Sequence, residues 1–148
     1  MSKMTIDTKR WELKLLHLTS AVAGAVENSV KKGSDIVLKK TIQNLSGQAH
    51  PYGTPGPSPG ELPVTRITSN LKGSMRMEKV AYDLILIFPD VNKAPYAAAV
   101  HDGSKDVDNA VIMPRRPYLY EAVRETREQV TDKIKDEFLS VIREYGLS

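Results

Sequence analysis

The sequence predicts an α+β protein in which long N- and C-terminal helices pack on a small, mostly antiparallel sheet, with a protruding Pro/Gly-rich loop. Apolar residues recur at helical spacing near both ends of the chain, and they alternate at strand spacing in the middle. At roughly 150 residues per domain, the 148 residues are predicted to form a single domain, 1–148. Within it we expect a helical segment at 1–46, an arm at 47–64, short helices and strands at 65–116, and a C-terminal helix at 117–146.

The first helix is predicted over residues 5–46. Its apolar stripe follows the i, i+3, i+4 spacing of a helix and consists of Trp11, Leu15, Leu18, Val22, Val26 and Val30. The pattern is interrupted at Gly33, which costs about 1 kcal/mol inside a helix, and Ser34 is a favourable N-cap for a new helix. The sequence therefore leaves two alternatives open, one long helix bent near Gly33 or two helices in succession.

Residues 47–63 carry five prolines and four glycines, so no regular structure is expected there. A long irregular loop inside a small domain is usually a functional arm or a linker. The preceding helical segment has too little apolar surface to form a domain of its own, so we interpret the loop as an arm that projects from a single domain. The arm is polar and stiffened by proline, which favours a surface that binds a partner.

Residues 75–88 are predicted to be strand, because apolar and polar residues alternate in the first half of this segment. A hairpin that turns near Val80 and Ala81 is the alternative to one continuous strand. The second half, residues 82–88, is apolar on both faces, which predicts an inner strand covered by helices.

Short elements are expected on either side of this strand. A helical turn is predicted at residues 70–74, and a short helix at 95–100 that Gly103 stops. Residues 104–110 are predicted to be loop, and residues 111–113 a third short strand.

The C-terminal helix, residues 117–146, is the clearest element. Pro117 suits the first position of a helix, because the N–H that proline lacks has no helical partner there. One face is apolar at helical spacing and is formed by Tyr120, Val123, Val130, Ile134, Phe138, Val141 and Tyr145. Acidic and basic residues three or four positions apart cover the other face, as is typical of a solvent-exposed helix surface.

The composition excludes several classes of protein. The chain has no cysteine, which rules out disulfide frameworks, thiolate zinc sites and thiol nucleophiles. Its net charge of +3 is too small to imply nucleic-acid binding by itself. No apolar run approaches the roughly 18 residues of a membrane span, and the N-terminus lacks the hydrophobic segment of a signal peptide, so we expect no membrane contact.

The charge is unevenly distributed along the chain. Residues 1–80 carry 12 basic and 6 acidic side chains, whereas residues 81–148 carry 9 basic and 12 acidic ones. This asymmetry is typical of subunits that stack head to tail or line a channel, or else of charges that merely solvate two amphipathic helices.

The sequence contains no strong catalytic or metal-binding motif, and we predict neither an enzyme, nor a cofactor, nor a metal site. The histidines are His17, His50 and His101, with none of the short spacings that gather a metal. His101, Asp102 and Ser104 are too close in sequence to form a catalytic triad. Asp102, Asp106 and Asp108 resemble a calcium loop, but the spacing differs from that of an EF-hand.

Three segments, taken in order, resemble one protein family. They are PYGTPGPSPG followed by TRITSNLKGSM, then APYAAAVHDGS, then MPRRPYLYEAV. Their order and spacing are similar to those of the head–tail joining and tail-completion proteins of tailed bacteriophages, in the gene-product-ten-like group of lambdoid siphophages. The matching residues are Thr68, Leu71 and Ser74, then Tyr96, Ala97, Val100 and Gly103, then Arg115, Pro117, Tyr118 and Leu119. The resemblance covers residues 48–148, two-thirds of the chain.

The resemblance implies a virion structural protein of the phage neck, a head–tail connector that forms a ring and completes or terminates the tail. The ring is implied to be a homo-oligomer, with six copies as in tail terminators or twelve as the alternative. Its implied partners are the head-completion or adaptor proteins and the tail tube protein. Such a protein is made in the host cytoplasm and resides in the virion. DNA that passes through the lumen is expected to make at most weak, non-specific contact.

The candidate site consists of residues that bind protein partners. These are Pro51, Tyr52, Pro55, Pro57 and Pro59 of the arm, together with Arg115 and Arg116. Three other residues of the matching motifs, Tyr96, Val100 and Leu119, are expected to shape the core of the subunit.

Two other functions remain alternatives. A nucleic-acid-binding module would use the basic residues Lys31, Lys32, Lys39, Lys40, Arg66, Lys72 and Arg76. A small hydrolase would use His101 and the acids near it, and it would lose a measurable activity in His101→Ala.

Overall fold

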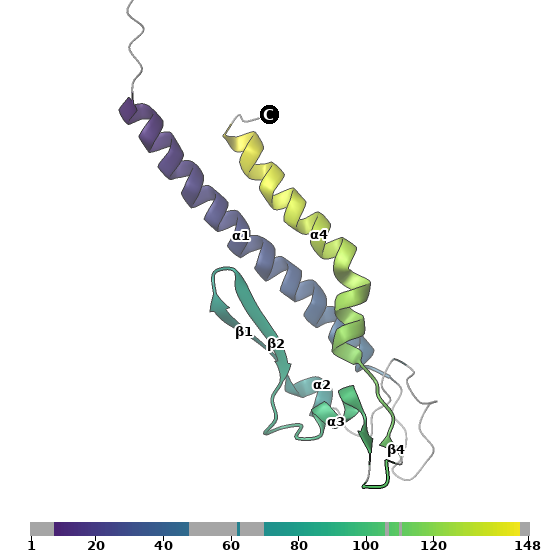
Figure 1. The fold of residues 1–148 in the computed structure, drawn as a ribbon. Helices are drawn as coiled ribbons and strands as arrows, with labels where there is room; N and C mark the ends of the chain where they lie inside the picture. Colours follow the sequence, from purple (N-terminus) through teal and green to yellow (C-terminus); the bar gives the residue numbers. More distant parts are fainter. Residues whose placement is uncertain (1–7, 48–61, 63–69, 106, 110, 146–148) are drawn as a thin grey trace, which may run out of the picture.

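The computed structural model describes residues 8–47, 62, 70–105, 107–109 and 111–145. The elements are α1 (Thr8–Asn44), α2 (Asn70–Ser74), β1 (Met75–Ala81), β2 (Leu84–Pro89), α3 (Ala97–Asp102), β3 (Ser104–Lys105), β4 (Val111–Met113) and α4 (Tyr118–Glu144). Figure 1 shows α1 and α4 running side by side, with the β1–β2 hairpin beside them. The short elements gather where α1 ends and α4 begins. The predicted α+β class is confirmed.

The first helix is continuous through Gly33, which settles the alternative that the sequence left open. The reason is tertiary: a Cβ atom built on Gly33 would lie 3.0 Å from Cγ1 of Val130 in α4. Other buried residues of α1, such as Ala25 and Ser29, are also small. The small residues let the backbones of α1 and α4 approach closely, and this packing offsets the intrinsic helix cost of glycine.

Buried hydroxyls along this interface are satisfied within their own helices. Ser29 Oγ donates to the carbonyl of Ala25 at 2.6 Å, and Thr126 Oγ1 donates to the carbonyl of Ala122 at 2.7 Å. A buried hydroxyl without a partner would destabilise the pair by about 1–3 kcal/mol. Because these hydroxyls are satisfied, small polar residues can lie where α1 and α4 pack most closely.

Ion pairs flank the same interface. Lys32 of α1 pairs with Glu137 of α4, and Lys40 Nζ lies 2.6 Å from Glu125 Oε2. Tyr145, just after α4, donates its hydroxyl to the carbonyl of His17 at 3.3 Å. The contacts between α1 and α4 thus extend over most of the length of α4.

The hairpin corrects two expectations. Residues 75–88 form a hairpin, the alternative that the sequence left open, and not one continuous strand. The turn lies at Tyr82 and Asp83, directly after Val80 and Ala81, and β1 pairs with β2 in antiparallel register, with Lys79 opposite Ile85. The prediction of an inner strand covered on both faces is wrong. Among the described residues only β1 borders β2. The helices lie on one side of the hairpin (Figure 1), so every second side chain of β2 points away from them.

A second sheet corrects the loop predicted at residues 104–110. Ser104–Lys105 forms β3, which pairs antiparallel with β4, Val111–Met113, so residues 111–113 form a strand as predicted but do not join the hairpin. Asn109 adopts a positive φ of 62° before β4, a conformation that asparagine tolerates better than most residues. The described chain therefore contains two separate two-stranded antiparallel sheets instead of one small sheet.

The close approach at Gly33 is tested by placing the same side chain at two glycines of α1. We expect Gly33→Leu to lower the free energy of unfolding by about 1–3 kcal/mol, because the new side chain overlaps Val130. A Cβ atom at Gly24 would instead enter open space, so Gly24→Leu should raise stability by about 0.5–1 kcal/mol through helix propensity. Urea denaturation of both variants measures the difference, and equal effects would contradict the packing described for α1 and α4.

Candidate functional site

A compact core lies where α1 ends and α4 begins. Its buried residues are Leu45, Leu71, Ala94, Ala97, Val100 and Tyr118. Tyr118 is only 2% exposed, and its ring meets that of His101 edge-on at a centroid distance of 5.1 Å. The Tyr118 hydroxyl donates to the carbonyl of Ala97 at 3.4 Å, and its own carbonyl accepts from Asn44 Nδ2 at 3.0 Å. One side chain and its backbone thus join the end of α1, α3 and the start of α4.

The segments that resemble the phage family meet in this core. The first contributes Leu71 and Ser74, whose Oγ donates to the carbonyl of Leu71 at 2.7 Å. The second contributes Val100, whose carbonyl accepts from the backbone N–H of Arg116 at 3.0 Å. Thr68 of the first segment lies outside the described residues. Segments that are separate in the sequence thus contact one another in the folded chain.

Gly103 has a specific role in this arrangement. Its φ is +81°, and a Cβ atom there would lie 3.0 Å from both the Arg115 nitrogen and the Met113 oxygen. Any other residue would be strained and would push against the backbone that leads into α4. Glycine therefore allows the chain after α3 to pass closely against the segment before α4.

The expectation that three motif residues shape the core is met in part. Val100 is buried, and Leu119 packs against the buried cluster. Tyr96 is 39% exposed, so its assignment to the core is wrong. Tyr96 directly precedes α3 and is partly exposed to solvent, whereas Tyr118 is buried in the core.

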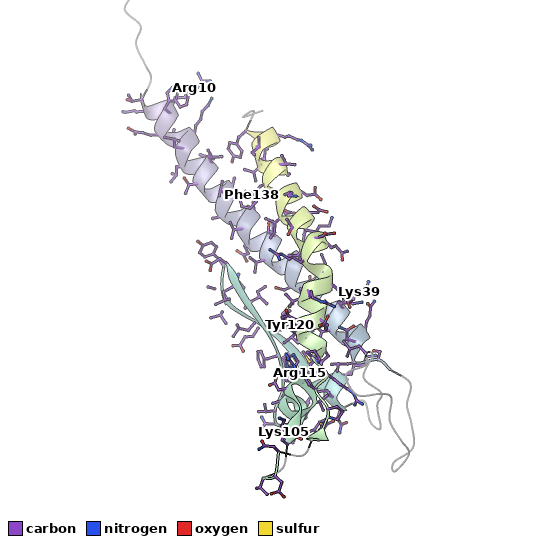
Figure 2. All side chains as sticks on the ribbon, turned by 45° about the vertical axis from the view of Figure 1, so that its right-hand side comes forward. Arg10, Lys39, Lys105, Arg115, Tyr120 and Phe138 are labelled. Atoms are coloured by element: carbon purple, nitrogen blue, oxygen red, sulfur yellow. The ribbon has the colours of Figure 1, made fainter. Side chains whose placement is uncertain are left out.

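Two of the seven predicted partner-binding residues lie among the described residues. Pro51, Tyr52, Pro55, Pro57 and Pro59 lie outside the described residues. Arg115 is exposed and Arg116 is half-buried. Figure 2 shows Arg115 at the end of the molecule that holds the core, far from Arg10 at the opposite end of α1. The exposure of Arg115 is compatible with a partner contact at this end.

The histidine of the hydrolase alternative is part of the core packing. His101 Nδ1 lies 2.7 Å from the carboxylate of the adjacent Asp102, and Nε2 is buried without a hydrogen-bond partner in the described structure. No hydroxyl nucleophile is therefore bonded to this ring within the described ranges. The same part of the chain holds no group of three metal-ligating side chains, and Asp106 of the calcium-like segment lies outside it.

Several residues of the basic set instead form ion pairs within the chain. Lys32 and Lys40 pair with carboxylates of α4, and Arg76 Nη2 lies 3.5 Å from Asp90 Oδ2. Lys31 and Lys39 are exposed, and Arg66 lies outside the described residues. The paired side chains have much of their charge compensated, which leaves less of the basic set to attract phosphate.

Two exposed apolar surfaces were not predicted from the sequence. The first, which we call the helix surface, surrounds the first turns of α1 and consists of Trp11, Leu13, Leu15 and Leu16, each 58–67% exposed, with Lys9 and Lys14 among them. The second, the hairpin surface, lies on the turn and outward face of the hairpin and consists of Val80, Tyr82, Leu84 and Leu86, with Glu78 and Asp83. The sequence held a signal for the first, because four of the six residues 11–16 are large and apolar and lie on more than one side of the helix. A helix that packs on a single partner buries one apolar stripe, so some of these side chains stay exposed.

An open groove of about 400 Å³ separates the hairpin from the two long helices. Its apolar lining includes Val30, Val37, Ile85, Ile87, Val123 and Ile134. The hairpin therefore rests on the helices without filling the space between them.

The chain was compared with protein-family models, with curated proteins and with solved structures, and none of the three comparisons gives a match. Among the helices of the described ranges, none combines the length and the apolar character needed to cross a bilayer.

The bond from Asn44 to Tyr118 is tested by two asparagines of α1. Asn44→Ala leaves the Tyr118 carbonyl without this donor, and we expect a loss of about 1–3 kcal/mol in the free energy of unfolding. Asn28 is exposed on the same helix, so Asn28→Ala should change stability by less than about 0.5 kcal/mol. Denaturant titrations of both variants decide the matter, and a loss in Asn44→Ala no larger than in the control would contradict a structural role for this bond.

Alkaline pH tests the burial of Tyr118. Burial, aided by the charge of Asp102, raises the pKa of Tyr118 to about 12, whereas an unfolded tyrosine titrates near 10. The stability that its protonated form contributes is complete below pH 10 and is lost as the pH rises through 12. We expect the free energy of unfolding to fall less steeply over this window in Tyr118→Phe than in the wild type. Tyr120 is exposed, so Tyr120→Phe should follow the wild type, and a parallel curve for Tyr118→Phe would refute the assignment.

Proposed function

We propose that the chain is a structural subunit of the neck of a tailed-phage virion, where it assembles as a ring that joins head to tail and completes the tail. The observation that carries the proposal is the pair of exposed apolar surfaces on a well-packed α1–α4 scaffold. Soluble monomers rarely expose large contiguous apolar patches, and such patches mark contacts with other proteins. The convergence of the three resembling segments in one core supports the choice of family.

The proposed work is mechanical rather than chemical. A ring of six copies, or of twelve, would bind the head-completion or adaptor proteins on one side and the tail tube protein on the other. The contacts between its subunits would be heterologous, and closure of the ring prevents such contacts from growing into filaments. The arm and Arg115 are the proposed contacts with other neck proteins.

The nucleic-acid alternative receives less support from the structure than the neck proposal. Lys32, Lys40 and Arg76 pair with carboxylates of the same chain. A neck through which DNA must move also gains nothing from tight phosphate contacts. We expect weak, sequence-independent DNA association that disappears as salt increases.

Deletion of residues 54–60 tests the neck function. Because five prolines in residues 47–63 oppose regular pairing, the deletion should leave the thermal midpoint of the purified subunit nearly unchanged. It should block the joining of heads to tails when the variant replaces the chain in its phage, measured as unjoined heads and tails in lysates and as loss of infectious particles. Val107→Ser, which alters an exposed side chain in another loop, is the control and should preserve particle yield.

A normal yield of infectious particles from the deletion would show that the arm is a linker. Absence of the wild-type chain from purified particles would contradict the neck function itself.

A further inference from the structure

The helix surface and the hairpin surface lie apart on the molecule. In both views the tip of the hairpin lies beside the middle of α1, and the first turns of α1 extend well beyond it (Figures 1 and 2). The start of α1, where Figure 2 labels Arg10, is therefore out of reach of the hairpin within one chain. Leu84 and Leu86 of the hairpin surface, 45% and 46% exposed, face away from α1.

The register of the hairpin prevents its exposed face from turning onto its own helices. Lys79 Nζ lies 2.5 Å from Glu27 Oε1 of α1, and Lys79 pairs with Ile85, so these two residues share the face toward the helices. Side chains alternate along a strand, so Leu84 and Leu86 must lie on the opposite face. A slip by one residue would expose Ile85 and Ile87 instead, and it would break the ion pair.

The charges of the two surfaces are complementary. On the hairpin, Lys79 and Arg76 are compensated by carboxylates, whereas Glu78 and Asp83 have no ion-pair partner among the described residues. The hairpin surface is therefore acidic.

The helix surface has the opposite balance. The first turns of α1 carry Lys9 and Lys14 against one carboxylate, that of Glu12. A second copy of this chain therefore offers what each surface lacks, apolar side chains of similar number and charges of opposite sign.

We propose that the hairpin surface of one copy packs against one side of the helix surface of the next copy. The contact is heterologous, so each copy uses its hairpin surface toward one neighbour and its helix surface toward the other, and the chain of contacts closes as a ring. Burial of the apolar side chains supplies the attraction, and the pairing of Glu78 and Asp83 with Lys9 and Lys14 sets the orientation. This inference rests on the ring assembly of the proposed function, and it names the surfaces that build that ring.

A mixing experiment tests the pairing of these two surfaces. The hairpin variant is Leu84→Ser with Leu86→Ser, and the helix variant is Trp11→Ser with Leu16→Ser. Val107, 98% exposed and outside both surfaces, supplies the control Val107→Ser. Native mass spectrometry of the purified full-length proteins gives their assembly states, and circular dichroism confirms that each is folded.

The wild type and Val107→Ser are expected to form rings, and each double variant alone is expected to be a monomer. An equal mixture of the two double variants should form dimers that contain one copy of each. The hairpin variant retains an intact helix surface and the helix variant an intact hairpin surface, so one contact is restored and growth stops there.

Rings formed by either double variant alone would overturn the inference, and so would a mixture that stays monomeric. In both cases a wild-type ring would leave the proposed function standing. A wild type that is monomeric at every concentration would overturn the ring and this inference together.

Charge reversal decides the question if a serine variant fails to fold. Glu78→Lys with Asp83→Lys should weaken the ring, and adding Lys9→Glu with Lys14→Glu to the same chain should restore it. Failure of the second pair to restore assembly would overturn the proposed contact.

Discussion

The close packing of α4 on α1 is the interaction on which the rest of the structure depends. It is possible because α1 presents small residues to α4, above all Gly33 opposite Val130. Ion pairs from Lys32 to Glu137 and from Lys40 to Glu125 also join the two helices. The hairpin rests mainly on α1, and the short elements are gathered at one end of the helix pair. Without α1 the hairpin would lose its support, and an isolated two-stranded hairpin is only marginally stable.

Tyr118 connects the helix pair to the small elements. It is the first residue of α4. Its buried ring and hydroxyl reach α3, and its carbonyl reaches the end of α1. The positive φ of Gly103 and its lack of a side chain let residues 113–115, which lead into α4, pass close to the end of α3. Several described residues of the motifs that resemble a phage neck family thus pack in this core. Among those motif residues Arg115 is exposed, and other exposed side chains lie on the first turns of α1 and on the hairpin.

A packed core at one end and exposed apolar side chains elsewhere are features expected of a subunit that assembles with other chains. One end of the chain is well packed by its own residues, whereas the first turns of α1 and the outward face of the hairpin leave apolar side chains in water. Burying them against another chain would contribute the hydrophobic free energy that the monomer forgoes. The acidic hairpin surface and the basic first turns of α1 give that burial a direction, and they offer a local explanation for part of the uneven charge along the sequence.

The sequence by itself determined the fold class, both long helices, a strand region with a possible hairpin and the short helices, because each depends on a local period of apolar residues or on proline and glycine. It also indicated residues 111–113 as strand. Only the tertiary structure decided that α1 continues through Gly33, that β2 is covered on one face, and that β3 pairs with β4. The exposure of Trp11 and Leu16 and the core position of His101 were likewise decided there. The physical reason is common to all of these: a sequence period shows which faces are apolar, but what covers each face depends on residues far away in the chain.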